Sequence, residues 1–174
     1  MTCKIVVMMK YYTYLFCLCI LLIGANNCTA QKKLPIHNKH VEITHHAISL
    51  NMNDSILLYI NQYRQNKGLA FLQLDSIISV VALEHSINMA TKKNAFGHDG
   101  FEERMQKIVK NFPKMKASAE NVAFGKLSAE GVVKGWINSP RHRKNIEGDY
   151  MYMGVGVAKD SKGISFFTQI FIRK

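Results

Sequence analysis

The C-terminal end of the chain decides the fold: it reads YMYMGVGVA from Tyr150 to Ala158 and ISFFTQIFI from Ile164 to Ile172. β-branched and aromatic residues fill both runs, as is typical of strands. The residues between them include Asp160, Ser161 and Gly163, which favour a tight turn. The two runs therefore predict an antiparallel β-hairpin at the end of the chain.

Apolar residues recur at helical spacing in four segments before this hairpin. The predicted helices run from 54 to 67, from 75 or 76 to about 94, from 101 to about 111, and from 128 through 137. The stretch from Ser118 to Gly125 is short and weakly extended, and the basic stretch from Arg141 to Asn145 is predicted to be irregular. Helices followed by a terminal hairpin predict an α+β fold with helices packed on a small sheet.

Composition narrows the class of protein. The chain has 174 residues, of which 48% are hydrophobic and 20% charged, so it can bury the core of one ordinary domain. A disordered tail, a collagen-like repeat and a multi-span membrane protein are excluded. All four cysteines lie in the first 30 residues. The body therefore holds no disulfide scaffold, cysteine-ligated zinc or cysteine nucleophile.

The N-terminal segment has the pattern of an export signal. Tyr11 to Gly24 is almost wholly apolar, follows Lys10 and precedes small residues up to Ala30. The run is shorter than the roughly 20 apolar residues of a membrane-spanning helix. We predict a signal peptide at 1–30, a His-rich linker at 31–50 and one domain at 51–174. A lipid-modified Cys28 and an uncleaved anchor stay open as alternatives.

The positive net charge predicts which partners the protein attracts. The formal net charge is +11, and loss of residues 1–30 would remove two lysines and no acid, leaving +9. We expect attraction to an anionic envelope surface, such as lipid headgroups or wall glycans. Nucleic acid is not expected, since the basic residues are scattered. The linker histidines predict either a pH-sensitive connection or, less directly, metal binding. We expect a monomer.

Three polar residues lie in segments marked by glycine or proline. His98 stands in Phe-Gly-His-Asp-Gly, Glu120 in Ala-Glu-Asn, and His142 in Ser-Pro-Arg-His-Arg. If they converge, two imidazoles and one carboxylate suit a divalent metal such as zinc, or could orient a water or a polar ligand. The alternatives are structural: Glu120 fixes a loop and His142 caps a helix end. His85, on the apolar face of its helix, is predicted to be a hydrogen-bonded core histidine.

Several catalytic motifs are missing. The sequence has no Gly-x-Ser-x-Gly turn, no His-Glu-x-x-His helix and no phosphate-binding loop. The sequence therefore contains no motif that indicates a serine hydrolase, a zincin protease or a nucleotide hydrolase.

Five ordered motifs carry a family resemblance. They are Gly-His-Asp-Gly-Phe (97–101), Ala-Glu-Asn-Val-Ala-Phe-Gly (119–125), Gly-Trp-Ile-Asn-Ser-Pro-Arg-His-Arg-Lys-Asn-Ile (135–146), Met-Gly-Val-Gly-Val-Ala (153–158) and Phe-Phe-Thr-Gln-Ile-Phe (166–171). From residue 54 to 174 the chain resembles the CAP superfamily, in its bacterial, cysteine-free, SCP-like branch. The resemblance implies a three-layer α-β-α sandwich with a central antiparallel sheet, and secretion.

The resemblance also implies a site. The eukaryotic branch has a cleft with two histidines and two glutamates, proposed to hold a divalent metal. His98 and Glu120 match the first histidine and one glutamate, whereas the other two positions fall at Ser139 and Phe166. His142 then supplies the missing imidazole. The expected ligand-binding residues are His98, Glu120, Asn121, Ser139 and His142, with His98, Glu120 and His142 as candidate metal ligands.

Three hypotheses about function follow. The favoured one is a secreted, non-enzymatic binding domain for a polar, lipidic or envelope-derived ligand, and no catalytic residue is assigned. The alternative is a hydrolase of envelope polymers or peptides, in which Glu120 or a histidine activates water, with or without metal. A structural or interaction module is the third.

Overall fold

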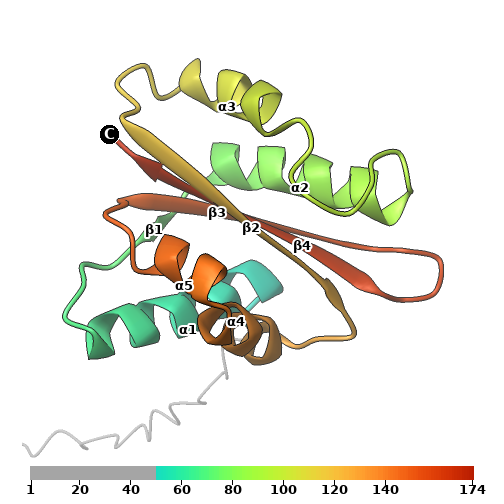
Figure 1. The fold of residues 1–174 in the computed structure, drawn as a ribbon, viewed down its shortest axis with the longest axis horizontal. Coiled ribbons are helices and arrows are strands. Elements are labelled where there is room, and N and C mark those ends of the chain that lie inside the picture. Colours follow the sequence, from blue (N-terminus) through green and yellow to red (C-terminus); the bar gives the residue numbers. More distant parts are fainter. Residues whose placement is uncertain (1–49) are drawn as a thin grey trace, which may run out of the picture. The chain divides into compact units, whose positions relative to one another are not determined.

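The computed structural model describes residues 50–174 (Figure 1). The predicted signal peptide and all but the last residue of the predicted linker lie outside these residues. In chain order the elements are α1 (Met52–Asn66), β1 (Gln73–Leu74), α2 (Ser76–Ala90), α3 (Phe101–Val109), β2 (Ala117–Gly125), α4 (Ala129–Asn138), α5 (Pro140–Ile146), β3 (Tyr152–Lys159) and β4 (Ser165–Arg173).

The four strands form one sheet in the order β1-β3-β4-β2. β3 and β4 are the predicted hairpin, with Tyr152 opposite Ile172. β2 pairs antiparallel with the other side of β4, so that Phe124 lies opposite Phe166. The predicted antiparallel sheet is confirmed, and the two-residue strand β1, which sequence analysis did not include, adds a parallel pairing to β3.

Helices cover both faces of the sheet, as Figure 1 shows. α2 and α3 lie on one face, and α1, α4 and α5 lie on the other. β4 serves both layers because successive side chains of a strand point to opposite faces. Phe167 and Phe171 pack toward α1 and α4, whereas Ile170 and Ile172 pack toward α2 and α3. The α+β, three-layer prediction is confirmed.

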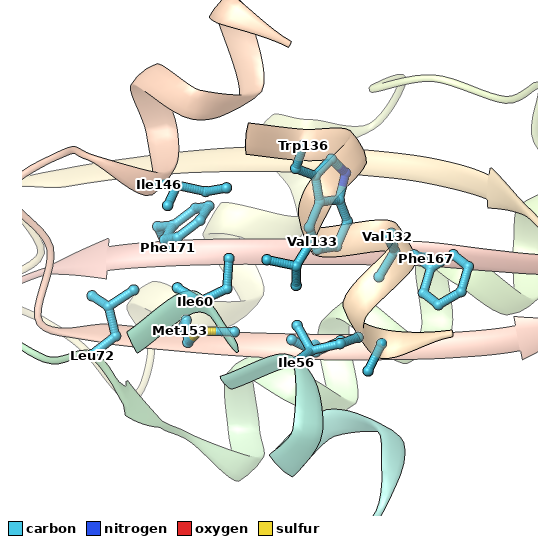
Figure 2. Packing of buried hydrophobic residues seen from close by; sticks show 12 residues of the cluster. Ile56, Ile60, Leu72, Val132, Val133, Trp136, Ile146, Met153, Phe167 and Phe171 are labelled. Carbon is cyan, nitrogen blue, oxygen red and sulfur yellow. The ribbon is translucent and has the colours of Figure 1, made fainter. Parts of the chain in front are cut away.

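The larger core surrounds Trp136, whose side chain is buried between α4 and the sheet (Figure 2). Ile56 and Ile60 of α1 reach the same cluster from the neighbouring helix. Trp136 Nε1–H also donates to the Val122 carbonyl oxygen at 3.4 Å, so α4 is tied to β2 by a polar contact inside the apolar layer. This contact sets α4 beside the outer strand of the described sheet.

The basic stretch after Pro140 is helical, which corrects the prediction of an irregular segment. Pro140 occupies the first turn of α5, where its missing N–H removes no helical hydrogen bond. The buried Ile146 anchors the far end of this helix in the core. The second predicted helix also ends earlier than expected, at Ala90, and Lys92 follows with a positive φ of 59°.

Two glycines let α2 lie directly on β3. A Cβ placed on Gly154 would meet the backbone of Ile78 and Ser79, and one on Gly156 would meet the backbone of Ala82 and Leu83. In both cases the approach is closer than real Cβ atoms show, and backbone cannot swing away as a side chain can. The absence of side chains at these two positions therefore determines how close α2 comes to the sheet.

Replacing Gly156 with alanine tests this close packing. We expect Gly156→Ala to lower the free energy of unfolding by about 3 kcal/mol or more, at or above the upper end of ordinary overpacking costs. Gly135→Ala is the matched control, since a Cβ at that exposed helical position meets nothing within 4 Å. The control should be neutral or raise stability by up to about 1 kcal/mol. Equal effects of both changes in urea denaturation would contradict the packing argument.

Candidate functional site

The centre of the site is a buried ion pair between α3 and β2. Arg104 Nε donates to Glu120 Oε2 at 2.8 Å, and Arg104 Nη2 donates to Glu120 Oε1 at 2.8 Å. Both side chains are at least nine-tenths buried. Two parallel N–H···O bonds of this kind fix direction as well as distance. The pair therefore locks α3 against the strand that carries Glu120.

Arg104 also organises the loop that carries His98. Its Nη1 donates to the Asp99 carbonyl oxygen at 2.8 Å, and its Nη2 lies 3.3 Å from the His98 carbonyl oxygen. Gly100, which ends the loop, has φ of 77°, a left-handed conformation that glycine adopts without strain. One guanidinium thus holds the loop backbone and the Glu120 carboxylate together.

His85 supports the same loop from α2 and is buried. Its Nε2 lies 2.9 Å from the Gly97 carbonyl oxygen, so Nε2 carries the proton and donates. Its Nδ1 then accepts from Arg104 Nη1 at 3.2 Å. Burial is the main cause of the lowered pKa of His85, and the Arg104 charge lowers it further. His85 is the hydrogen-bonded core histidine that its place on the helix predicted.

His98 presents one ring nitrogen to solvent. Its Nδ1 lies 2.9 Å from Glu120 Oε1, and the carboxylate accepts the Nδ1 proton. The side chain is 53% exposed, whereas that of Glu120 is 2% exposed. A buried carboxylate that orients an exposed imidazole leaves Nε2 as an acceptor for a ligand or a water. His98 is therefore the accessible member of the Arg104–Glu120–His98 chain.

A second polar network lies on the opposite face of β2. Asn121 is fully buried; its Nδ2 lies 3.2 Å from the His142 carbonyl oxygen and 3.2 Å from Gln169 Oε1. Asn145 Nδ2 donates to Asn121 Oδ1 at 2.9 Å and lies 3.2 Å from the Glu120 carbonyl oxygen. These bonds fasten α5 to the sheet, so Asn121 positions the backbone of His142.

A hollow of about 310 Å³ opens beside β2, where β2 faces α4 and the start of α5. Its apolar lining comes from Val122, Phe124, Leu127, Val132 and Trp136, together with Phe96 of the preceding loop. Ser139 and His142 are its polar lining residues. Burial lowers the pKa of His142, and the charge of His98 lowers it further. His142 is therefore the titratable residue of this lining, and His98 does not belong to the lining.

The structure relates the predicted site residues as follows. His98 and Glu120 are in direct contact, Asn121 bonds to the His142 backbone, and Ser139 and His142 line the hollow. Sequence reasoning missed Arg104, although a signal was present. Arg104 shares its helix face with Phe101, Met105 and Ile108, and a charge on an apolar helix face usually has a buried partner.

The residues present do not fit a metal shared by His98, Glu120 and His142. Both Glu120 oxygens already accept hydrogen bonds, from Arg104 and from His98 Nδ1. In the described part of the chain, no group of three or more His, Cys, Asp or Glu side chains is placed to hold a metal ion. A guanidinium lies where a cation bound to this carboxylate would lie. The metal hypothesis stays a prediction that this arrangement does not favour.

Comparison with known proteins identifies the family. The CAP family, described as the cysteine-rich secretory protein family, matches residues 57–171. The chain belongs to the CAP family. Two Bacillus subtilis proteins are similar to this CAP domain. The uncharacterised protein YkwD is 38% identical, and the match covers 66% of this chain and 44% of YkwD. The uncharacterised membrane protein YlbC is 31% identical, and the match covers 73% of this chain and 36% of YlbC. The chain thus spans less than half the length of these curated relatives.

Solved CAP structures agree. An extracellular protein of Bacillus anthracis that contains an SCP domain aligns with a TM-score of 0.60 and 30% identity, over 70% of this chain and 40% of that one. A cysteine-rich secretory protein of Staphylococcus aureus aligns with a TM-score of 0.58 and 26% identity, over 71% of this chain and 39% of that one. An outer surface protein of Borrelia burgdorferi shares the fold with a TM-score of 0.57 and 24% identity, over 72% of this chain and 96% of that one. The Bacillus anthracis neighbour is thus described as extracellular and the Staphylococcus aureus neighbour as secretory, whereas YlbC is described as a membrane protein. Over residues 50–174, no helix has the length and apolarity that a bilayer crossing needs.

The buried ion pair gives a testable stability difference. We expect Arg104→Met to cost about 3–5 kcal/mol, because it leaves the Glu120 carboxylate buried without its cation. Adding Glu120→Gln should recover part of that loss, with a coupling energy of about 1–3 kcal/mol in a double-mutant cycle from denaturation.

Lys107 on the same helix provides the control for this cycle. It donates to Glu84 at 2.7 Å, but both side chains are about half exposed. Lys107→Met should cost no more than about 1 kcal/mol, as for other surface pairs. Strict additivity of Arg104→Met and Glu120→Gln would contradict the assigned pair.

His85 predicts a pH dependence of stability. Its pKa is lowered in the folded state, so the unfolded chain takes up the His85 proton first, near the ordinary pKa of about 6.5. Stability from this group is fully present above that pH and is lost as pH falls toward the folded pKa. His142 acts in the same direction.

The measurement is the free energy of unfolding between neutral and mildly acidic pH. We expect it to fall on acidification in the wild type, and less steeply in His85→Gln, by up to about 1.4 kcal/mol per pH unit for one proton. Glutamine can still donate to the Gly97 carbonyl oxygen and accept from Arg104. Identical slopes in the two proteins would show that His85 does not titrate with unfolding.

Proposed function

We propose that this CAP domain is an extracellular, non-enzymatic binding module whose hollow beside β2 holds an amphipathic ligand with a polar or anionic head and an apolar tail. The observation that carries the proposal is the lining of the hollow: apolar side chains with Ser139 and His142 as the polar residues. Small-molecule sites usually have a volume of about 300 Å³ or more and a largely apolar lining with a few polar groups.

The polar end suits a head group that accepts or exchanges hydrogen bonds. His142 is half-buried, and its lowered pKa favours the neutral imidazole at neutral pH. His98 has an exposed side chain, and its ring is held by Glu120. A neutral imidazole can both donate and accept hydrogen bonds, as can the hydroxyl of Ser139, so the two polar residues of the hollow suit such a head group. The proposal thus uses His98, Glu120, Asn121, Ser139 and His142, with Glu120 and Asn121 as positioning residues.

Extracellular action is supported by the relatives and by the sequence. The Bacillus anthracis neighbour is described as extracellular, and the Borrelia burgdorferi neighbour as an outer surface protein. The apolar stretch 11–24 has the pattern of a secretory signal. Envelope lipids and lipid-linked glycans are the amphipathic molecules that an extracellular bacterial domain meets.

The His98–Glu120 contact supports one second candidate, a hydrolase. A carboxylate behind an imidazole is an arrangement that also serves general bases, and His98 Nε2 could activate a water. Turnover separates the two functions. A hydrolase would lose its rate in His98→Gln while ligand binding persisted, whereas a binding module shows no turnover of envelope peptides or glycans in either protein.

Filling the hollow tests the binding function. Gly135 lines the hollow, and a Cβ there meets nothing within 4 Å, so Gly135→Leu should occupy the hollow without disturbing α4. We expect dodecanoate to bind the wild type saturably in calorimetry, and Gly135→Leu to weaken that binding about tenfold or more, which is about 1.4 kcal/mol. Lys134→Leu, one residue earlier on the exposed side of α4, should leave affinity within about twofold.

Two outcomes would refute the proposal. One is the absence of saturable dodecanoate binding combined with native mass spectra that show no retained ligand. The other is equal weakening by Gly135→Leu and Lys134→Leu, since the second change does not enter the hollow.

A further inference from the structure

We propose that one end of the sandwich docks on an anionic lipid bilayer, with exposed phenylalanines entering the interface and surrounding lysines meeting the headgroups. This aromatic end consists of Phe96, Phe124 and Phe166, with the lysines at 92, 93, 126, 159 and 162. Phe96 and Phe124 also line the hollow, so the two surfaces adjoin, but the inference concerns a bilayer as the partner and needs no ligand in the hollow.

The three rings form one cluster at the molecular surface. Phe96 and Phe124 meet edge to face with centroids 4.8 Å apart, and Phe166 lies 5.9 Å from Phe124 and 6.5 Å from Phe96. Phe124 is 57% exposed and Phe96 46% exposed, and the neighbouring Leu127 is also exposed. Contiguous exposed apolar side chains of this size mark a binding surface rather than a random scatter.

Strand register places three of the lysines at this end. Phe124 lies opposite Phe166, and Lys126 follows directly after the end of β2. Lys159 lies opposite Ser165, next to Phe166, and Lys162 is in the β3–β4 turn. All three lysines are exposed. The turn and the end of β2 therefore bring positive charge to the rim of the aromatic cluster.

Two further lysines come from the end of α2. Lys92 and Lys93 are exposed and directly precede the loop that contains Phe96. The C-terminal end of α2, the β3–β4 turn and the end of β2 lie at the same end of the sheet (Figure 1). Because Phe96 contacts both other rings, this loop is joined to the strands there.

Acidic side chains offset part of this charge, but the five lysines outnumber them. Asp160 is in the same turn, where its Oδ1 accepts from the backbone N–H groups of Lys162 and Ile164, and it keeps its negative charge. Asp99 is exposed in the loop that contains Phe96. Glu130 is exposed in the first turn of α4, with Lys134 one turn further along. The aromatic end is therefore net positive, complementary to anionic lipid headgroups.

Charge complementarity together with aromatic exposure selects a bilayer as the partner. Aromatic rings prefer the boundary between headgroups and acyl chains, and lysines at the same level gain from the negative surface potential. Each lysine near such a surface is worth on the order of fivefold in affinity. An acidic protein would match the charge, but it would not require a cluster of three rings of which two, Phe96 and Phe124, are exposed.

The test introduces a fluorescent tryptophan into the cluster of phenylalanines. The full chain carrying Phe124→Trp is titrated with vesicles containing brominated acyl chains, made of phosphatidylcholine alone or mixed with phosphatidylglycerol. The signal of the unsubstituted chain, whose Trp136 is buried, is subtracted. We expect quenching of the introduced tryptophan in the anionic vesicles, weakened at high salt because salt screens the lysine contribution.

Charge reversal separates docking from other membrane contacts. Lys126→Glu, Lys159→Glu and Lys162→Glu together should raise the lipid concentration for half-maximal quenching by on the order of a hundredfold. The matched control reverses Lys110, Lys114 and Lys116, exposed lysines near the opposite end of β2. This control variant should need a lipid concentration for half-maximal quenching within about threefold of that of the protein with all lysines intact. Its lysines lie far from the bilayer, and salt screens charge attraction over such distances. The apolar stretch 11–24 is present in every variant and cancels.

Three outcomes would overturn the inference: no quenching in anionic vesicles, equal quenching in both kinds of vesicle, or equal loss from the two triple variants. Failure of docking and failure of ligand binding are distinguishable, because dodecanoate binding is measured without a bilayer and Gly135→Leu changes none of the lysines.

Discussion

The direct contact between α2 and β3 is the constraint on which the rest of the structure depends. Gly154 and Gly156 have no side chains to separate the two backbones, so α2 is held at a fixed height above the sheet. His85 on that helix then reaches Gly97, and Ser86 Oγ donates to the Gly156 carbonyl oxygen at 2.9 Å. The loop that carries His98 is thus placed by a helix that has little freedom to shift.

The site is built in two layers around β2. On one face, Arg104 and Glu120 hold the His98 imidazole, and on the other, Asn121 and Asn145 hold the backbone of His142. Adjacent residues of a strand point to opposite faces, so the pair Glu120-Asn121 serves both networks. The consecutive Glu-Asn of the family motif is therefore one structural unit that orients groups on both sides of the sheet.

Sequence reasoning predicted what depends on local pattern and missed what depends on distant partners. Runs of β-branched and aromatic residues around a turn located the β3–β4 hairpin, and helical periods located four helices, two of which start next to Asp75 and Ser128 as predicted. The helix after Pro140 was missed because its stability comes from burial of Ile146 and from bonds to Asn121, which composition cannot show. β1 has only two residues and exists through its pairing with β3.

For the site, the motifs predicted that His98 and Glu120 belong to one cleft, but they predicted neither the direct contact between them nor the part played by Arg104. Its guanidinium is part of the chain and cannot dissociate, so the counter-charge of Glu120 is present in every molecule from the moment it folds. A carboxylate balanced by a bound ion would depend on supply and would respond to chelators. The hydrogen bond that orients His98 therefore needs no bound metal ion to balance the charge of Glu120.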